Sequence, residues 1–250
     1  MEAKDWDKIS KEYHEYIISP FQKGVVNPLF RKLKSIKSRQ DKVIADIGCG
    51  RGEIGDKLGG LFKEVHLIDF SPAMIDIAKK QNKAKNIKYH IADIRELSKF
   101  NNMFDAVIAV NSVIMPSIAD LKKAFSSIHA TLKQDGVFFG IFPSMESITY
   151  QAFLILEQQV DRFDDEEKAV TNAKRLLERG KYSFVKGVYE DQGEAQKFYY
   201  DFELKIRLQD AGFKKVRISK VLYPWGRATG DFKDFPGRPK MWDWFVSAVK

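Results

Sequence analysis

One glycine-rich stretch constrains this chain more than any other part of its sequence. Three apolar residues, 43–45, lead into Asp46, and Gly48, Gly50 and Gly52 then follow at alternate positions. Residues 53–58 can begin a helix. A strand that ends in glycines and leads into a helix brings bare backbone N–H groups close to a ligand, because no Cβ stands in the way. The same backbone can anchor a carboxylate or a phosphate. The stretch therefore predicts a nucleotide-like ligand at a strand end.

Two common phosphate-binding patterns fit this stretch poorly. The dinucleotide fingerprint requires glycine at its sixth position, and counting from Gly48 that position holds Glu53. A P-loop ends in Gly-Lys-Ser/Thr, whereas Gly55 is followed by Asp56. The stretch instead resembles motif I of the class I S-adenosylmethionine-dependent methyltransferases, Asp-x-Gly-x-Gly-x-Gly, at residues 46–52. That resemblance implies S-adenosyl-L-methionine as the cofactor.

Apolar runs and helical periodicities alternate along the rest of the chain, which is typical of an α/β fold. We predict a Rossmann-like, doubly wound sheet of seven strands, mostly parallel with the last strand antiparallel. After the first strand at 43–47, the expected strands are 65–69, 87–93, 105–110, 136–142, 215–223 and 242–249, and the expected helices are 72–81, 118–132 and 202–211.

Polar residues follow three further strands, and parallel strands of an open sheet bind ligands beyond their carboxyl ends. Asp69 lies 69 − 48 = 21 residues after Gly48, close to the spacing of a carboxylate that accepts both ribose hydroxyls, although it can also cap the next helix. Asp93 follows the third strand, where an N-cap is the alternative, and Asn111 follows the fourth. We expect these strand ends to form one crevice.

The family resemblance assigns more specific roles to residues around these strand ends. Asp93 would accept a hydrogen bond from the adenine amino group, the backbone N–H of Ile94 would meet a ring nitrogen, and Met74 would pack near the adenine. Core packing alone explains Met74 almost as well. The full set of expected cofactor-binding residues is Asp46, Gly48, Cys49, Gly50, Gly52, Asp69, Phe70, Met74, Asp93, Ile94 and Asn111.

The chain is expected to form a single domain, 1–250, with two additions. Residues 1–40 predict an N-terminal helical cap, and the segment around Tyr13 resembles the helix that covers the cofactor in the family. Residues 145–200 predict an inserted lid of two helices, 149–159 and 166–180, and a hairpin of strands 183–189 and 194–200. Three tyrosines of the insertion are candidates to line the acceptor site, although they can equally stabilise the hairpin: Tyr189, Tyr199 and Tyr200.

Methyl transfer from a sulfonium needs a base only when the acceptor must lose a proton. Tyr13, His14 and Tyr200 are weak candidates for that base, and the sequence does not choose among them. The four histidines stand apart from one another, so no metal site is expected. Cys49 lies inside the glycine turn and is a poor nucleophile there.

Composition limits the partners. A single cysteine and the lack of a long apolar run or signal pattern predict a cytoplasmic protein without a membrane segment. The net charge of +8 suggests nucleic acid, yet the lysines are scattered along the chain. We therefore expect a small-molecule acceptor. The alternatives are an RNA or protein methyltransferase, or a catalytically silent cofactor-binding subunit.

Overall fold

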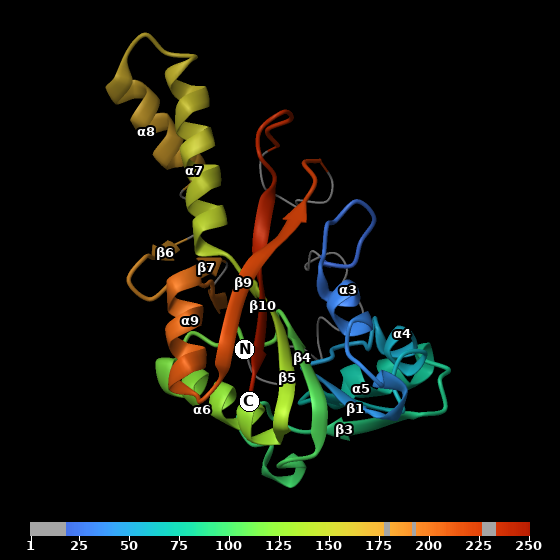
Figure 1. Cartoon of the computed structure of the whole chain (residues 1–250). Helices are drawn as coiled ribbons and strands as arrows, with labels where there is room; N and C mark the ends of the chain where they lie inside the picture. The colour runs from blue at the N-terminus through green and yellow to red at the C-terminus, as the bar shows by residue number, and fades with distance from the viewer. Residues whose placement is uncertain (1–18, 178–180, 192–193, 227–233) are drawn as a thin grey trace.

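The computed structural model describes residues 19–177, 181–191, 194–226 and 234–250, and its centre is a seven-stranded sheet in the order β3-β2-β1-β4-β5-β10-β9 (Figure 1). Strands β1 to β5 run parallel, and β10 is antiparallel to both of its neighbours. This confirms the predicted fold class. The strands are β1 (Val43–Ile47), β2 (Glu64–Asp69), β3 (Ile87–Ile91), β4 (Phe104–Val110), β5 (Leu132–Pro143), β9 (Lys214–Tyr223) and β10 (Met241–Val249).

Helices cover both faces of the sheet because successive strand residues point to opposite sides. Ala45 and Ile47 pack into one buried cluster with α6 and α9, whereas Ile44 packs into a second cluster with α3, α4 and α5. The helices are α3 (Leu29–Lys34), α4 (Gly55–Gly59), α5 (Pro72–Gln81), α6 (Ile118–Thr131), α7 (Met145–Val160), α8 (Glu166–Leu177) and α9 (Asp201–Asp210), with short 3-10 turns at Arg39–Asp41 and Ser98–Phe100.

The inserted segment after β5 departs from the sheet. Helices α7 and α8 form a hairpin that extends beyond the rest of the molecule in Figure 1. A separate three-stranded antiparallel sheet follows, in the order β6-β7-β8, formed by β6 (Lys181–Ser183), β7 (Val188–Asp191) and β8 (Glu194–Lys197). The predicted strand 183–189 was wrong in its extent. Gly187 has a φ of 60°, which turns the chain between β6 and β7.

The predicted N-terminal cap, 1–40, is described only in part. Helix α3 begins at Leu29, because Pro28 has no backbone N–H to donate to a preceding helical turn. Val26 instead forms a β-bridge with Leu222 of β9. The first 18 residues of the predicted cap, 1–40, lie outside the described residues. No helix in the described ranges is long and apolar enough to cross a membrane.

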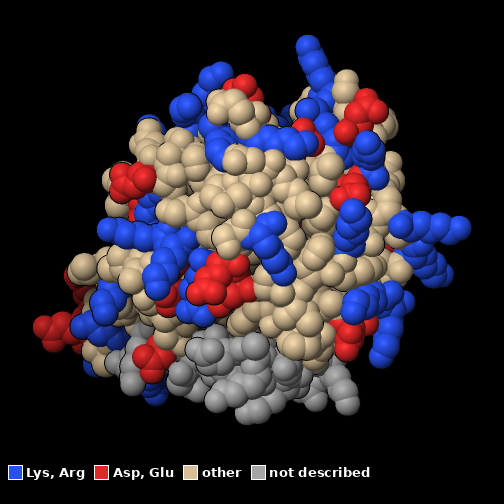
Figure 2. Space-filling model, turned by 90° about the horizontal axis from the view of Figure 1, so that it is seen from below, with Lys and Arg blue, Asp and Glu red and all other residues tan. Residues whose placement is uncertain are grey.

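Basic residues do not gather into one patch on the face shown in Figure 2. Lysine and arginine side chains are spread over that face, and acidic side chains lie among them. A continuous basic stripe is the usual electrostatic footprint of nucleic-acid binding. This face does not have one.

Candidate functional site

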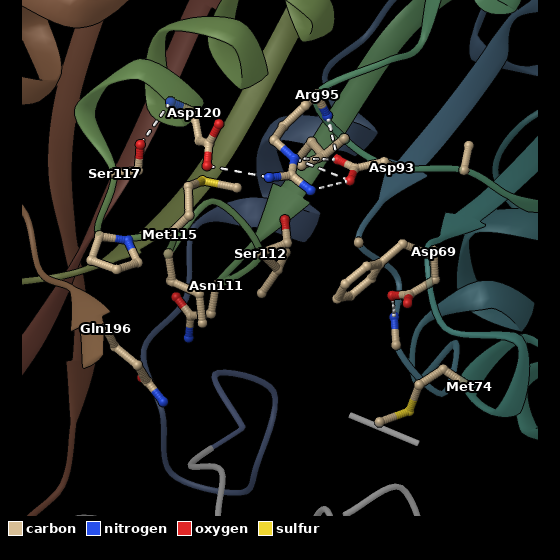
Figure 3. Close-up of a pocket in the computed structure, with 18 of the residues that line it drawn as sticks. Asp69, Met74, Asp93, Arg95, Asn111, Ser112, Met115, Ser117, Asp120 and Gln196 are labelled. Carbon is tan, nitrogen blue, oxygen red and sulfur yellow. Dashed lines mark hydrogen bonds and ion pairs between the residues drawn. The ribbon is translucent and has the colours of Figure 1, made fainter. Parts of the chain in front are cut away.

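A cavity of about 310 Å³ lies at the carboxyl ends of the parallel strands. The chain reverses its direction across the sheet between β1 and β4, and ligands of open α/β sheets bind at such a reversal. Eight of the expected cofactor-binding residues line this cavity, namely Gly48, Gly50, Asp69, Phe70, Met74, Asp93, Ile94 and Asn111. The structure thus brings together residues from four strand ends (Figure 3).

The glycine loop owes its shape to backbone that most residues avoid. Gly48, Gly50 and Gly52 have φ values of 73°, 52° and 71°. A Cβ on Gly48 would collide with the side chain of Ser112, whose hydroxyl donates to the Ile47 carbonyl at 2.8 Å. Gly48 therefore lets the loop after β4 approach the end of β1.

Gly52 has a different position from its two neighbours. It lines neither this cavity nor a second, smaller hollow beside it. A Cβ on Gly52 would meet Asn82, Ala78 and Leu67, so this glycine allows the loop to pack against α5.

Asp69 holds the loop and faces the cavity. Its Oδ2 accepts a 2.8 Å hydrogen bond from the backbone N–H of Gly50, and its Oδ1 accepts one of 2.9 Å from Ser71. The N-cap of α5 is Ser71, whose hydroxyl accepts from the N–H of Met74 at 3.1 Å. Asp69 therefore orients the glycine loop as well as presenting a carboxylate to the ligand.

The carboxylate of Asp93 is engaged by Arg95. Arg95 donates from its backbone N–H (2.8 Å) and Nε (3.0 Å) to Oδ1, and from Nε (3.0 Å) and Nη2 (2.6 Å) to Oδ2. Burial alone would raise the pKa of Asp93, but the hydrogen bonds and charge of Arg95 outweigh it and hold that pKa below 3.8. Arg95 also reaches Asp120 of α6 through Nη1, at 3.2 Å.

A second hollow of about 180 Å³ adjoins the cavity and shares Gly48, Val110 and Asn111 with it. Asp46 and Cys49, the remaining expected cofactor-binding residues apart from Gly52, line this hollow. Burial, then Asp69 and Glu53, raise the pKa of Asp46 to about 8. Burial also raises the pKa of the Cys49 thiol well above its ordinary value, so the thiol stays protonated.

Two buried polar atoms at this hollow, one from an acidic and one from a basic side chain, have no partner among the described residues. They are Oδ1 of Asp46 and Nε of Arg51. Buried polar groups are nearly always hydrogen-bonded, so such atoms at a cavity indicate a ligand. An amino-acid head group carries an ammonium and a carboxylate, which matches both. The residues present therefore fit the methionine end of S-adenosylmethionine.

Asn111 joins the cavity to the far strands of the sheet. It has a φ of 48°, and its side chain hydrogen-bonds to Asp243 at the start of β10. Asp243 also accepts a 2.6 Å hydrogen bond from the Tyr223 hydroxyl. Burial raises the pKa of Asp243 to about 6, although these hydrogen bonds oppose the rise. Neither Asp243 nor Tyr223 was expected from the sequence, because strand pairing alone brings them to Asn111.

Of the three predicted catalytic candidates, the structure describes only Tyr200. Tyr13 and His14 lie outside the described residues. Tyr200 donates from its hydroxyl to the Phe184 carbonyl at 3.0 Å and is not among the lining residues. The cavity face of the insertion is instead formed by Ala195 and Gln196 of β8 (Figure 3).

The other two tyrosines proposed for the acceptor site are packed elsewhere. Tyr199 is fully buried and donates to the Val113 carbonyl at 2.6 Å, and Tyr189 packs against Tyr182. Among the described residues, no group of three or more His, Cys, Asp or Glu could hold a metal ion.

Comparison with known proteins gives the same assignment as the site. The family model for "Methyltransferase domain" matches residues 44–136, which include the glycine loop and the four strand ends. Residues 44–136 therefore match a methyltransferase domain, and the similarities support the class I S-adenosylmethionine-dependent type. The chain is 26% identical over 179 residues to a malonyl-[acyl-carrier protein] O-methyltransferase of Bacillus anthracis, and the match covers 70% of this chain and 62% of that protein.

Solved structures share the fold of the methyltransferase domain. An S-adenosylmethionine-dependent methyltransferase from Mesorhizobium loti has a TM-score of 0.57 and 16% identity, covering 89% of this chain and 96% of its own. A putative methyltransferase solved with the Trm112 activator of Haloferax volcanii has a TM-score of 0.64 and 12% identity, covering 98% and 97%. The match to the first curated relative spans under two thirds of its length, and a second, from Bacillus cereus, is matched over 48%.

Proposed function

We propose that this chain binds S-adenosyl-L-methionine and transfers its methyl group to a small-molecule acceptor. The observation that carries the proposal is that the cavity and the adjoining hollow lie side by side and share Gly48, Val110 and Asn111. One end presents the strand-end acids that suit a nucleoside, and the other presents a buried acid and a buried base that suit an amino acid. S-adenosylmethionine joins these two chemical halves in one molecule.

Each part of the site would hold a different part of the cofactor. Asp69 would accept hydrogen bonds from the ribose hydroxyls, and Asp93 with the N–H of Ile94 would meet the adenine, whose face Phe70 and Met74 would contact. Asp46 and Asn111 would face the ammonium, and Arg51 the carboxylate. Bound S-adenosylmethionine supplies a methyl group that its sulfonium makes electrophilic.

The protein's contribution to the transfer would be positioning and exclusion of water. The acceptor side of the cavity is formed by the loop after β4, with Ile114, Met115 and Pro116, and by Gln196 of the insertion. Apolar walls would hold the acceptor against the cofactor, and Gln196 would orient it by hydrogen bonding. A base would be needed only for an acceptor that loses a proton on attack.

The Bacillus anthracis relative is a malonyl-[acyl-carrier protein] O-methyltransferase, which makes carrier-bound acyl groups a class to test alongside free small molecules. The competing proposal is an RNA acceptor, favoured by the net charge of +8. RNA binding through phosphate contacts would weaken steeply as salt rises, whereas small-molecule binding would not. Titration with RNA at two salt concentrations separates the two.

The first experiment is calorimetric titration of the purified chain with S-adenosylmethionine, S-adenosylhomocysteine and NADH. Micromolar binding of the first two without the third is the expected result. A folded chain that binds neither of the first two contradicts the proposal. Binding without methyl transfer to any acceptor, until a partner protein is added, would instead favour a cofactor-binding subunit.

A further inference from the structure

The acid expected to recognise adenine is already occupied in this structure. All four hydrogen bonds to the Asp93 carboxylate come from Arg95, and two of them use Oδ2, the oxygen that the backbone N–H leaves free. A carboxylate has about four acceptor positions. The single hydrogen of Nε is shared between both oxygens, so three N–H donors surround the carboxylate, and both guanidinium donors lie on Oδ2. An amino group that binds Oδ2 therefore competes with the guanidinium for that oxygen.

Arg95 has a second acid within reach. Its Nη1 lies 3.2 Å from Oδ2 of Asp120, in the first turn of α6. Figure 3 shows the guanidinium between the two carboxylates at the wall of the cavity. A guanidinium prefers to bind a carboxylate through two parallel hydrogen bonds, and Asp120 now receives only one from it. A rotation that brings Nη2 to Asp120 would complete that pair.

Such a rotation would cost little. The side chains of Arg95, Asp93 and Asp120 are 35%, 30% and 28% exposed, so the two ion pairs are partly screened by solvent. The backbone N–H of Arg95 would stay on Oδ1 of Asp93 throughout and would keep the carboxylate oriented. Only the second oxygen, Oδ2, would become free.

We propose that Arg95 competes with the adenine amino group for Asp93, and that Asp120 receives the guanidinium when the cofactor binds. Arg95 is thus a positioning residue that sets how strongly the site selects a 6-amino purine. While Arg95 binds Asp93, its guanidinium offers donors to the oxygen of a 6-keto purine and so lowers the selectivity for the 6-amino purine. The inference rests on the proposed function, because it concerns how the same site recognises the base.

The test compares S-adenosylhomocysteine with S-inosylhomocysteine, which carries a keto oxygen in place of the amino group. Calorimetry gives the ratio of the two dissociation constants for the intact chain and for Arg95→Met and Asp120→Asn. Two exposed residues outside the cavity provide matched controls, Arg31→Met and Asp76→Asn. Thermal unfolding shows that each variant is folded.

Arg95→Met is expected to raise the selectivity for the amino form by about tenfold, because the freed carboxylate accepts from the amine and repels the keto oxygen. Asp120→Asn is expected to weaken S-adenosylhomocysteine binding about threefold or more and to lower that selectivity, because Arg95 then stays on Asp93. Both controls should keep the original ratio.

Selectivity that stays within about twofold of the original in both folded variants overturns the inference while leaving cofactor binding intact. An original chain that binds neither nucleoside overturns the proposed function itself. If Arg95→Met does not fold, Arg95→Lys serves in its place. A lysine retains the charge but forms no fork, so an intermediate rise in selectivity supports the inference and an unchanged ratio opposes it.

Discussion

The parallel half of the sheet and the insertion of residues 145–200 both contribute to the cavity, but they are positioned in different ways. In the parallel half, the local chain places Gly48, Asp69 and Asn111 at one edge, because each lies at or directly after the end of a strand. In the insertion, Gln196 reaches the cavity because the next residue, Lys197, donates from its backbone to the Ile114 carbonyl at 2.8 Å. The residues proposed to hold the cofactor are thus placed by the local chain, whereas the residue proposed to contact the acceptor is placed by tertiary contacts.

Removing the carboxylate of Asp69 should have the largest effect. Asp69→Ala would lose two charge-assisted hydrogen bonds to ribose, each worth about 1.5–3 kcal/mol, so cofactor affinity should fall at least about 100-fold. It would also release the N–H of Gly50 from the loop. Calorimetry with S-adenosylhomocysteine measures the loss, and Asp76→Ala on the exposed face of α5 is the control. Unchanged affinity in Asp69→Ala would show that the ribose lies elsewhere.

This difference explains how far the sequence could predict the molecule. The succession of strands and helices along the chain, the glycine loop and the acids at the strand ends follow from periodicity and spacing, and the structure confirms the fold class they imply. Tyr199 illustrates the limit: an alternating pattern makes it equally a lid residue or a core residue. Its hydroxyl reaches the Val113 carbonyl, 86 positions away, and no local signal indicates that contact.

The unexpected polar residues of the site share the same origin. Asp243 meets Asn111 only because β10 inserts between β5 and β9. Arg95 lies in a stretch where the sequence pattern indicates only Asp93 and Ile94, although a basic residue two positions after an acid is a signal of a local ion pair. The resemblance of residues 46–52 to a family motif therefore identified the cofactor end and gave no information about the groups that surround it.

Replacing Lys197 tests whether the insertion can be loosened without disturbing the cofactor end. This lysine is 1% exposed and donates to the Glu203 carboxylate at 2.7 Å and to the carbonyls of Lys186 and Phe198. Lys197→Met should cost about 2–3 kcal/mol of unfolding free energy, somewhat below the usual loss for one partner of a buried pair. The expected cost is lower because Arg207 also binds Glu203, at 2.7 Å, so Glu203 keeps one cationic partner in the variant.

Urea unfolding measures the stability of Lys197→Met, and calorimetry measures its cofactor affinity. We expect affinity within about twofold of the original, because Lys197 does not line the cavity. Lys220→Met, at a partly exposed lysine that lies over Trp242, is a control for removing one lysine outside the insertion. A large loss of cofactor affinity in Lys197→Met would mean that the two regions are energetically coupled.

Asp46→Asn should separate stability from binding within the parallel half. The folded-state pKa of Asp46 is raised from 3.8 to about 8, so its contribution to stability is present below pH 3.8 and is lost as pH rises towards 8. The asparagine variant escapes that loss and should be more stable than the original by about 1–2 kcal/mol at pH 8. Cofactor affinity should fall, because the ammonium loses its anionic partner. Thermal unfolding from pH 5 to 9 and calorimetry at pH 8 measure both, and a variant less stable at pH 8 than the original contradicts the assignment.

The smallest expected effect concerns a histidine pair that lies in the parallel half but outside the cavity. His90 of β3 stacks on buried His66 of β2, with Nε2 of His90 3.0 Å from Nδ1 of His66, and His66 lies 2.6 Å from Glu64. Burial, His66 and nearby lysines lower the pKa of His90 from 6.5 to about 4. Its contribution to stability is therefore present above pH 6.5 and is lost as pH falls to 4.

His90→Gln keeps a side-chain donor for His66 and removes the titration. Because His90 is partly exposed, the difference in stability lost by the two proteins between pH 6.5 and 4 should be only about 1 kcal/mol. Urea unfolding at both pH values measures it, and cofactor affinity at pH 7 should not change. An equal loss in both proteins would assign the acid sensitivity to other groups. A change in affinity would show that the β2–β3 edge, and not only its carboxyl end, takes part in the site.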